Sequence, residues 1–403
     1  SDHQGCMKKS SLVAVLATFS TVCASGVSKS VLIGPKAIGM GGAFVGIADD
    51  ATAIYHNPAG ISQLKGHHFF LGADALITDL DYTPAPGTTE KAKTEFIPVP
   101  TFGYTTDILK PVTLGLGVFF PHGNGAKFDG ASAAPFNPDE GRIYSMEISP
   151  TASWEIIKNL SLGASLRIVR ASVSLKNQFV LLSASPLVTD TVEDLDVSGW
   201  GLAAAAGLFY RPVDEISLGV NYRSRFKKTP DGTVDLATAG SFDASLDQVL
   251  PTQINGGIGL YPNDDLTIGL GYSFERNSEI DSFDATVKTP TPTALSLPQN
   301  WTDSHTVHLG AEYWFWPSFA LRGGYAVDVK NSISDAVNNR ITGDIAAQET
   351  SAGFAYRWNN YEAGLTWNAR FGKRTVPNNG TNVAPGKYEA FVQMVSLGLS
   401  ASL

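Results

Sequence analysis

The chain has 403 residues, of which 17% are charged, 40 are glycine and only 2 are cysteine. This length fits one large domain or two ordinary ones. The formal net charge of −9 argues against a nucleic acid partner. After the N-terminal segment, no stretch reaches the roughly 18 to 20 apolar residues that a membrane-spanning helix needs. If the chain crosses a bilayer, it must therefore cross with strands.

The N-terminal segment has the pattern of a signal peptide. A basic start at residues 7–9 is followed by a largely apolar run over residues 12–22 and by a small-residue cleavage signal that ends at Ala24. We assign residues 1–24 to a signal peptide, with extra residues before Met7. Both cysteines then fall outside the mature chain, which needs no disulfides.

Fourteen later segments alternate apolar residues with small or polar ones. In one of them Leu266, Ile268 and Leu270 alternate with Thr267 and Gly269. A period of two gives a strand one apolar and one polar face. An even number of strands lets the sheet close without a free edge, as hydrocarbon surroundings require. The sequence therefore predicts an all-β fold, a 14-stranded antiparallel transmembrane β-barrel over residues 66–403. Its strands are expected at about 66–78, 94–105, 111–121, 142–155, 159–175, 197–211, 214–226, 250–261, 264–276, 301–314, 317–329, 346–358, 360–371 and 386–403.

The connections between these segments are alternately tight and long, as in outer-membrane barrels. A soluble sandwich or propeller also alternates, but its exposed face would carry more charge than these rows of Gly, Ser and Thr. Several aromatic residues lie beside the tight connections, where an interfacial girdle is expected. They are Trp154, Tyr210, Tyr261, Trp314, Trp316 and Trp358.

A glycine-rich segment precedes the first predicted strand. Residues 37–60 read AIGMGGAFVGIADDATAIYHNPAG, in which the glycines permit close packing and Asn-Pro favours a tight turn. A barrel of fourteen strands is a water channel unless something plugs it. The segment resembles the N-terminal hatch of the FadL/TodX family of outer-membrane transporters for long-chain fatty acids and aromatic hydrocarbons. Segments 218–224, 309–313 and 321–328 resemble strand motifs of the same family.

The resemblance implies that residues 25–65 form a hatch inside the lumen. The residues that match the family's Asp-Asp-Ala and Asn-Pro-Ala runs are then the hatch and gating candidates. On its own, Asn-Pro-Ala-Gly would be an ordinary turn. The candidates are Asp49, Asp50, Asn57, Pro58, Ala59 and Gly60.

In the family, movement of the hatch and an inward kink in the third strand open a lateral route into the membrane. The matching strand here covers residues 111–121, with Gly115 and Gly117 facing inward and Pro121 at its end. Glycine inside a strand weakens the ladder and marks bends. An equally good interpretation is that these small residues make room for the plug.

Cations in the lumen are candidates for binding a substrate carboxylate. By strand phase, the lumen contains Arg322 and His308, besides Arg223, Arg225, Arg370 and Glu312. The fifth strand is ambiguous, because the family match points to Arg170 whereas strict alternation turns Arg167 inward and Arg170 outward. A β-bulge would be needed to reconcile the two.

We find no P-loop, paired-cysteine metal site or Gly-x-Ser-x-Gly elbow. We therefore expect no catalytic residues, no metal and no cofactor. A barrel lipase would need His and Ser on the same lipid-facing surface. His308 with Ser273 or Ser304 remains open as such a pair, although nothing favours it.

The sequence thus predicts a monomeric protein of the Gram-negative outer membrane that takes up hydrophobic small molecules passively, most readily long-chain fatty acids, through a hatch-gated lumen with lateral exit. Expected partners are the substrate, lipopolysaccharide and other outer-membrane lipid, and the barrel-assembly machinery. The alternative function is a surface scaffold whose loops bind a partner protein while nothing crosses the lumen.

Overall fold

The computed structural model describes residues 33–94, 96–128, 139–180, 191–237, 240–288, 293–299, 301–338, 340, 344–380, 382 and 384–403. The predicted signal peptide lies outside these residues. None of the helices in the described part of the chain is long and apolar enough to span a bilayer.

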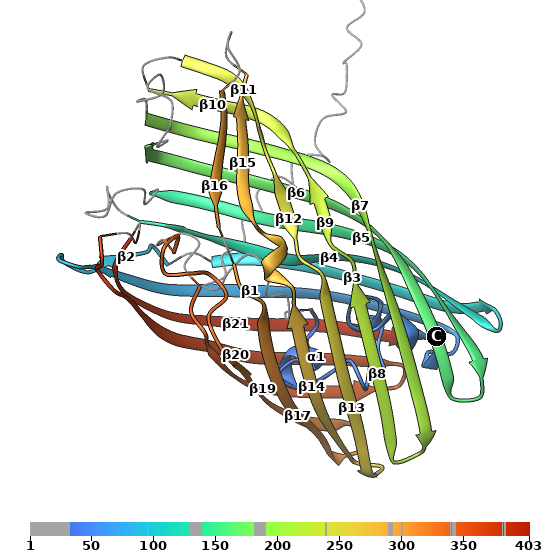
Figure 1. The fold of residues 1–403 in the computed structure, drawn as a ribbon. Coiled ribbons are helices and arrows are strands. Elements are labelled where there is room, and N and C mark those ends of the chain that lie inside the picture. Colours follow the sequence, from blue (N-terminus) through green and yellow to red (C-terminus); the bar gives the residue numbers. More distant parts are fainter. Residues whose placement is uncertain are drawn as a thin grey trace, which may run out of the picture.

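Fourteen long antiparallel strands form one closed barrel (Figure 1). Each strand pairs with the next along the chain, and the last strand returns to pair with the first from His68–Ser402 to Pro84–Gly386. Each of the fourteen predicted segments overlaps one of these strands, so the predicted fold class is confirmed. The wall strands are β1 (His67–Pro84), β3 (Phe96–Leu109), β4 (Val112–Lys127), β5 (Glu140–Ile157), β6 (Leu160–Val180), β7 (Thr191–Val213), β8 (Ile216–Arg223), β13 (Gln253–Asn263), β14 (Leu266–Glu275), β17 (Ser304–Trp316), β18 (Phe319–Asp328), β19 (Gln348–Trp358), β20 (Tyr361–Val376) and β21 (Gly386–Ser402).

Burial along the wall follows the period of two. In β8, Leu218 and Val220 are exposed on the outer face, while Ser217, Asn221 and Arg223 are buried inside. This is the reverse of a water-soluble protein, because the outer face of a transmembrane barrel contacts lipid. Two of the aromatics beside the tight connections face inward: the rings of Tyr261 and Trp314 pack against arginine side chains, and for Trp314 the strand register already indicates the lumen side.

Three of the predicted long connections contain strands of their own, and the shortest of these is β2, between β1 and β3. Part of the connection between β8 and β13 pairs with the outer end of β7, and its hairpin pairs in turn with strands from the connection between β14 and β17. In Figure 1 these strands extend the sheet beyond the barrel at the end opposite the short turns. The added elements are β2 (Glu90–Lys91), β9 (Phe226–Lys228), β10 (Asp231–Leu236), β11 (Gly240–Leu246), β12 (Gln248–Leu250), β15 (Ser282–Val287), β16 (Thr293–Pro298) and the 3₁₀ helix η3 (Asn277–Glu279).

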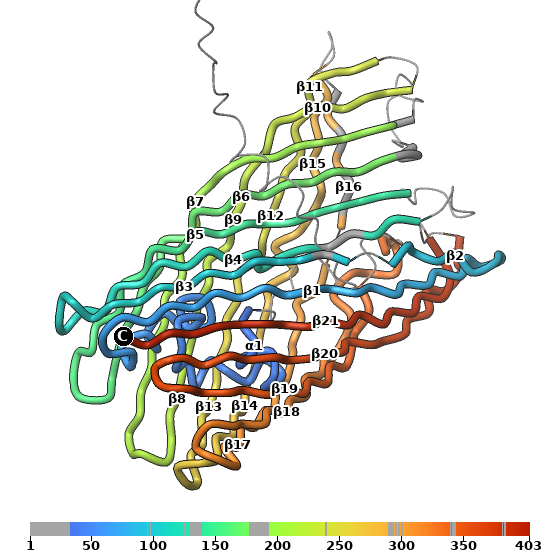
Figure 2. Tube along the Cα trace, turned by 180° about the vertical axis from the view of Figure 1, so that it is seen from behind, coloured from blue at the N-terminus to red at the C-terminus, as the bar shows by residue number. Residues whose placement is uncertain are grey.

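The segment before β1 folds inside the barrel. It contains the short helices α1 (Pro35–Gly39) and α2 (Ala53–His56) and the 3₁₀ helix η2 (Pro58–Gln63). Both views place it near the end with the short turns, which is also where the C-terminus lies (Figures 1 and 2). We call residues 33–64 the hatch.

Candidate functional site: the hatch and the lumen

The conformation of the hatch is stabilised by packing of a few apolar side chains and by tight turns, since its helices are short. Its residues Ala37, Met40, Phe44 and Ile47 form one buried cluster. Gly41 and Gly42 have φ values of 60° and 81°, a conformation that side chains with a Cβ rarely adopt. The glycine-rich sequence therefore allows this compact path.

Asn57 joins the hatch to itself and to the wall. Its Oδ1 accepts from the backbone N–H of Ala59 at 3.2 Å and so caps η2, in which Pro58 occupies the first position. Its Nδ2 donates to the carbonyls of Val45 and Leu208, each at 3.0 Å. Asn57-Pro58 thus forms a turn, as its sequence predicts. The Asn57 side chain also bonds the hatch to β7.

Glycines of the wall lie directly against the hatch. A methyl group added at Gly163 would overlap the backbone of Pro58, and one added at Gly310 would overlap that of Met40. We call this set the glycine belt. Strand phase identifies these glycines as inward-facing, but the partner of each depends on the path of the hatch. The belt consists of Gly163, Gly207, Gly219, Gly257, Gly269, Gly310 and Gly324, one from each of seven strands.

Polar side chains of the wall bind carbonyl oxygens of the hatch around the same level. Ser153 donates to Ala59 at 3.0 Å and Thr366 donates to Pro35 at 2.7 Å. His308 Nδ1 lies 2.8 Å from the carbonyl oxygen of Gly41. The substrate-binding candidate His308 is therefore inside the lumen, as predicted, but it is in contact with the hatch.

The two acidic hatch candidates have different surroundings. Asp50 accepts from the backbone N–H of Thr52 at 2.7 Å and from its hydroxyl at 2.5 Å. Burial raises the pKa of Asp50 to about 6, and the neighbouring Asp49 carboxylate adds to the rise. Asp49 itself forms an ion pair with Lys36 at 2.8 Å.

Lys36 begins a chain of ion pairs between the hatch and the wall. Its Nζ lies 3.0 Å from Glu312, which accepts from Arg322 Nε at 2.6 Å. Arg322 also donates to Glu362 at 2.6 Å. Burial alone would lower the pKa of Lys36, but Asp49 and Glu312 hold it above its ordinary value. Arg322, a substrate-binding candidate, is thus paired with two wall carboxylates. Nothing in the sequence distinguished Lys36 from other lysines.

A second cluster of buried charged side chains contacts α2 and contains more positive than negative groups. Glu147 Oε2 accepts from Arg167 Nε at 3.0 Å and from Arg223 Nη2 at 2.7 Å. The Arg223 guanidinium lies 3.9 Å from the centroid of the Tyr55 ring. His122 is also buried, and its Nε2 has no hydrogen-bond partner among the described residues. We call Glu147, Arg167 and Arg223, with the neighbouring His122, the cation cluster. Neither Glu147 nor His122 is a candidate in the sequence analysis.

Strict alternation holds along β6. Arg167 is buried in the lumen, whereas Arg170 is exposed on the outer face, beside Ser198 and the ring of Trp200. The family match that turned Arg170 toward the ligand is therefore wrong about its direction. Arg225, expected in the lumen, is likewise exposed and donates to the carbonyl of Glu279.

The His-Ser pairs considered for a lipase lie on the lumen side. His308 Nε2 is 3.0 Å from Ser273 Oγ, but its other ring nitrogen is bound to the hatch. Ser304 is buried and bonded to Asn277 and Glu275. Neither pair presents a nucleophile on the lipid-facing surface.

The wall has an irregularity at the third strand, β4. The ladder between β3 and β4 ends at Phe102–Val118. Beyond it β4 pairs with β5, and only at its end does it bond on the other side, where the Lys127 carbonyl accepts from the Lys93 N–H at 2.7 Å. Its pairing with β5 shifts by one residue between Phe119 and His122, where Pro121 has no N–H to donate. This is the position at which the family resemblance predicts a kink.

Gly115 and Gly117 of β4 face the hatch. A methyl group at Gly115 would come within 3.0 Å of Ile54, and one at Gly117 would overlap the Phe119 ring. Room for the hatch is therefore one function of these glycines, and the irregularity at Pro121 lies beyond them.

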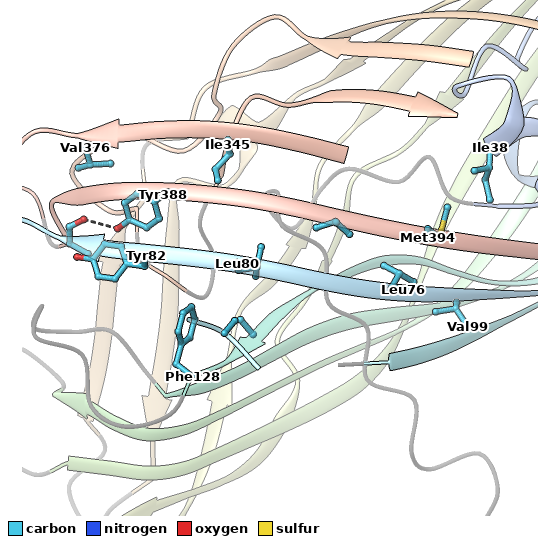
Figure 3. Close-up of a cluster of buried hydrophobic side chains, with 14 residues drawn as sticks. Ile38, Leu76, Leu80, Tyr82, Val99, Phe128, Ile345, Val376, Tyr388 and Met394 are labelled. Carbon is cyan, nitrogen blue, oxygen red and sulfur yellow. Dashed lines mark hydrogen bonds between the residues drawn. The ribbon is translucent and has the colours of Figure 1, made fainter. Parts of the chain in front are cut away.

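Apolar side chains line the lumen beside this irregularity. The row begins at Tyr82 and Tyr388, whose ring centroids are 4.7 Å apart, and leads to the hatch residue Ile38 (Figure 3). We call it the apolar row. The remaining buried members are Leu76, Leu80, Ala92, Val99, Ala126, Phe128, Ile345, Val376, Ala384, Val392 and Met394.

Comparison with known proteins identifies one family of outer-membrane proteins. A profile described as outer membrane protein transport protein (OMPP1/FadL/TodX) matches residues 14–381. The Neisseria meningitidis serogroup B protein NMB0088 is 22% identical over 335 residues, which are 70% of this chain and 72% of that protein.

Two solved structures share the fold. A Pseudomonas aeruginosa FadL homologue superposes with a TM-score of 0.78 at 17% identity, over 93% of this chain and 100% of its own. The Pseudomonas putida toluene transporter TodX superposes with a TM-score of 0.73 at 16% identity, over 94% of this chain and 100% of its own.

Proposed function

Because the chain belongs to the OMPP1/FadL/TodX family of outer-membrane transport proteins, we propose that it takes up long-chain fatty acids passively. It is an outer-membrane β-barrel of a family that transports hydrophobic compounds. Fatty acids are the proposed class because they combine an apolar chain with a single carboxylate. The apolar row offers surface for the chain, and the cation cluster offers charge for the head group.

The observation that carries the proposal is the sharing of Glu147 by two arginines. One carboxylate cannot neutralise both Arg167 and Arg223, so the cation cluster retains a net positive charge in a buried place. Buried charges are costly unless they are paired. A substrate carboxylate would supply the missing negative charge through charge-assisted hydrogen bonds, each worth about 1.5–3 kcal/mol.

For the route out, we propose the interval between the outer parts of β3 and β4. Its edges lack a shared ladder, and it lies beside Val99 and Phe128 of the apolar row. A substrate leaving there would pass from apolar side chains into the lipid without crossing the hatch completely.

The test compares uptake of oleate with uptake of a neutral alkane of similar length by cells that express the natural protein, Arg167→Met, Arg223→Met or Arg170→Met. Removal of either buried arginine leaves Glu147 paired with the other, so the barrel is expected to fold. We expect Arg167→Met and Arg223→Met to lower oleate uptake about tenfold, with alkane uptake unchanged.

Arg170→Met is the matched control, because this arginine lies on the outer face of the same strand, and it should leave both rates unchanged. Equal loss of oleate and alkane uptake would make the two buried arginines structural. If the natural protein takes up neither compound, the transport proposal is wrong and the scaffold function becomes the better hypothesis.

A further inference from the structure

The connection between β18 and β19 folds inward instead of running over the surface. We call its described residues, 329–338, 340 and 344–347, the inner connection. Ile333 and Asp344 are buried, although a connection normally stays exposed because its backbone polar groups need partners. Those partners are supplied here. The Asp344 carboxylate accepts from the backbone N–H groups of Ser332 and Ile333, and Arg374 of β20 donates to the carbonyls of Ile333 and Asp344, each at 2.7 Å. The base of the inner connection is thus fixed to the wall.

The inner connection lies between two opposite walls of the lumen. Ile345 belongs to the apolar row, together with Val376 of β20 (Figure 3). Ile333 belongs to a separate buried cluster, which contains Val197 of β7. Counted from β20 through β21, β1, β3, β4, β5 and β6, strand β7 is the seventh in a wall of fourteen, so it lies opposite β20. The inner connection therefore occupies the space between these walls.

Arg340 joins the inner connection to two other connections. Its guanidinium lies 2.7 Å from Glu90, between β1 and β3, and 2.7 Å from Asp139, between β4 and β5. It also lies 4.5 Å from the ring centroid of Phe128, a member of the apolar row. The Arg340 side chain is 1% exposed, whereas those of Glu90 and Asp139 are 18% and 15% exposed. Arg340 therefore covers the outer end of the apolar row, with its two carboxylate partners on the solvent side.

These ion pairs are suited to breaking and forming again. A fully buried pair is costly to break, because each charge then lacks a partner in an apolar place, whereas water solvates the separated charges of an exposed pair. Glu90 and Asp139 already contact solvent, and movement of the inner connection outward would carry the Arg340 guanidinium into water. The base, bound by Arg374, has no such access to solvent.

We propose that the inner connection is the outer gate of the lumen and that Arg340, paired with Glu90 and Asp139, is the latch that keeps it closed. When the pairs form, the inner connection covers the outer end of the apolar row. When they break, it moves about the base bound by Arg374 and admits a hydrophobic molecule to the row. The inference rests on the transport of hydrophobic compounds by the family, whichever compound is carried, and adds control of entry to it.

The experiment measures access to the apolar row from outside the cell, which the long connections of an outer-membrane barrel face. The only two cysteines of the chain, Cys6 and Cys23, lie in the predicted signal peptide, so Leu76→Cys introduces a single thiol into the mature chain. Leu76 belongs to the apolar row and is 3% exposed. Its rate of reaction with a charged, membrane-impermeant methanethiosulfonate reagent is measured on intact cells.

Two further changes open the latch from its two sides in this Leu76→Cys chain. Arg340→Met removes the cation, and the double variant Glu90→Gln/Asp139→Asn removes both anions. We expect each to raise the labelling rate about tenfold. Arg357→Met is the matched control and should leave the rate unchanged. Arg357 also pairs with a carboxylate, at 2.9 Å, and stacks on a tryptophan ring, at 4.0 Å, but it lies beside a short turn at the other end of the barrel.

A labelling rate that is unchanged in both Arg340→Met and the double variant overturns the inference. So does labelling of Leu76→Cys alone that is already as fast as that of an exposed cysteine. Heat-modifiable migration checks that each barrel is folded, and if Arg340→Met is not, the double variant decides by the same criteria. Labelling needs no substrate and so separates the two proposals: faster labelling in cells that take up no oleate supports the gate and removes the fatty-acid proposal, whereas oleate uptake with unchanged labelling removes the gate alone.

Discussion

The side-chain amide of Asn57, in the hatch, donates a hydrogen bond of 3.0 Å to the carbonyl oxygen of Leu208, in the wall. The same Nδ2 binds Val45 within the hatch, so one residue determines both the shape and the position of this segment. We expect Asn57→Ala to remove both bonds and to leave the buried Val45 carbonyl without this donor, which costs about 1–3 kcal/mol, while the barrel ladder stays intact. Uptake of the transported compound should fall.

Hydrogen exchange measures this effect, because amides of residues 33–64 should exchange faster in Asn57→Ala while wall amides do not. Heat-modifiable migration in gels checks that the barrel is folded. Asn378→Ala is the control, since Asn378 binds a loop carbonyl on the surface. If hydrogen exchange of the hatch amides and uptake are both unchanged in Asn57→Ala, Asn57 only forms a turn and does not hold the hatch to the wall.

The glycine belt predicts that glycine-to-alanine substitutions on two neighbouring strands have different effects on channel conductance. Gly310→Ala places a methyl group against the backbone of Met40, whereas Gly323→Ala points a methyl group into open space. Since a backbone cannot move as a flexible side chain can, Gly310→Ala should displace this part of the hatch and increase single-channel conductance in planar bilayers. Gly323→Ala should behave like the natural protein. Equal conductance in both variants contradicts a close fit between hatch and wall.

The ion pairs of Lys36 predict that substitution of Glu312 strongly lowers the stability of the docked hatch. Glu312→Gln leaves Lys36 and Arg322 with less negative charge in a buried place, and loss of one partner from a buried pair costs about 3–5 kcal/mol. The exposed pair Lys65–Glu155, at 3.7 Å, is the comparison: Glu155→Gln should cost about 0–1 kcal/mol. Urea dependence of hatch proteolysis measures both. Similar midpoints for the two variants would show that Glu312 does not hold the hatch.

The pKa of Asp50 predicts that docking of the hatch depends on pH. Its docked pKa of about 6 lies above the ordinary value of 3.8, so the docked hatch binds more protons than the released hatch between these values. Docking should therefore weaken as the pH rises from about 4 to about 6 and then stay constant. Hydrogen exchange corrected for the intrinsic pH effect measures this. Asp50→Asn should remove the dependence over this range, and a variant with the natural slope would exclude Asp50 as its source.

Much of the barrel could be predicted because one local rule is repeated in each strand. Alternation located the wall strands and turned Arg167 inward and Arg170 outward, since lipid on one side and the lumen on the other impose a period of two. The same rule failed for Arg225, because it lies two residues beyond the end of β8, where the alternation of a strand no longer applies.

The partners inside the lumen could not be predicted in this way. Asn57 and Leu208 are 151 positions apart, and Glu147 meets Arg223 across 76. Which residues meet depends on how the hatch is folded and on the stagger of the strands. No short pattern in the sequence indicates either. The strands in the long connections were missed for a similar reason, since β10 pairs with β7, from which the whole of β8 separates it in the chain.

The glycine belt also constrains the order of events during assembly. The hatch precedes every wall strand in the chain, but the surface that receives it is supplied by strands from β4 to β20. The hatch thus has no complete binding surface until most of these later strands are in place. Contacts between such distant parts of a chain form slowly, because the intervening loop must close first. Docking of the hatch is therefore a late step, and a protease that cleaves the hatch only in unfinished molecules would time the closure of the barrel.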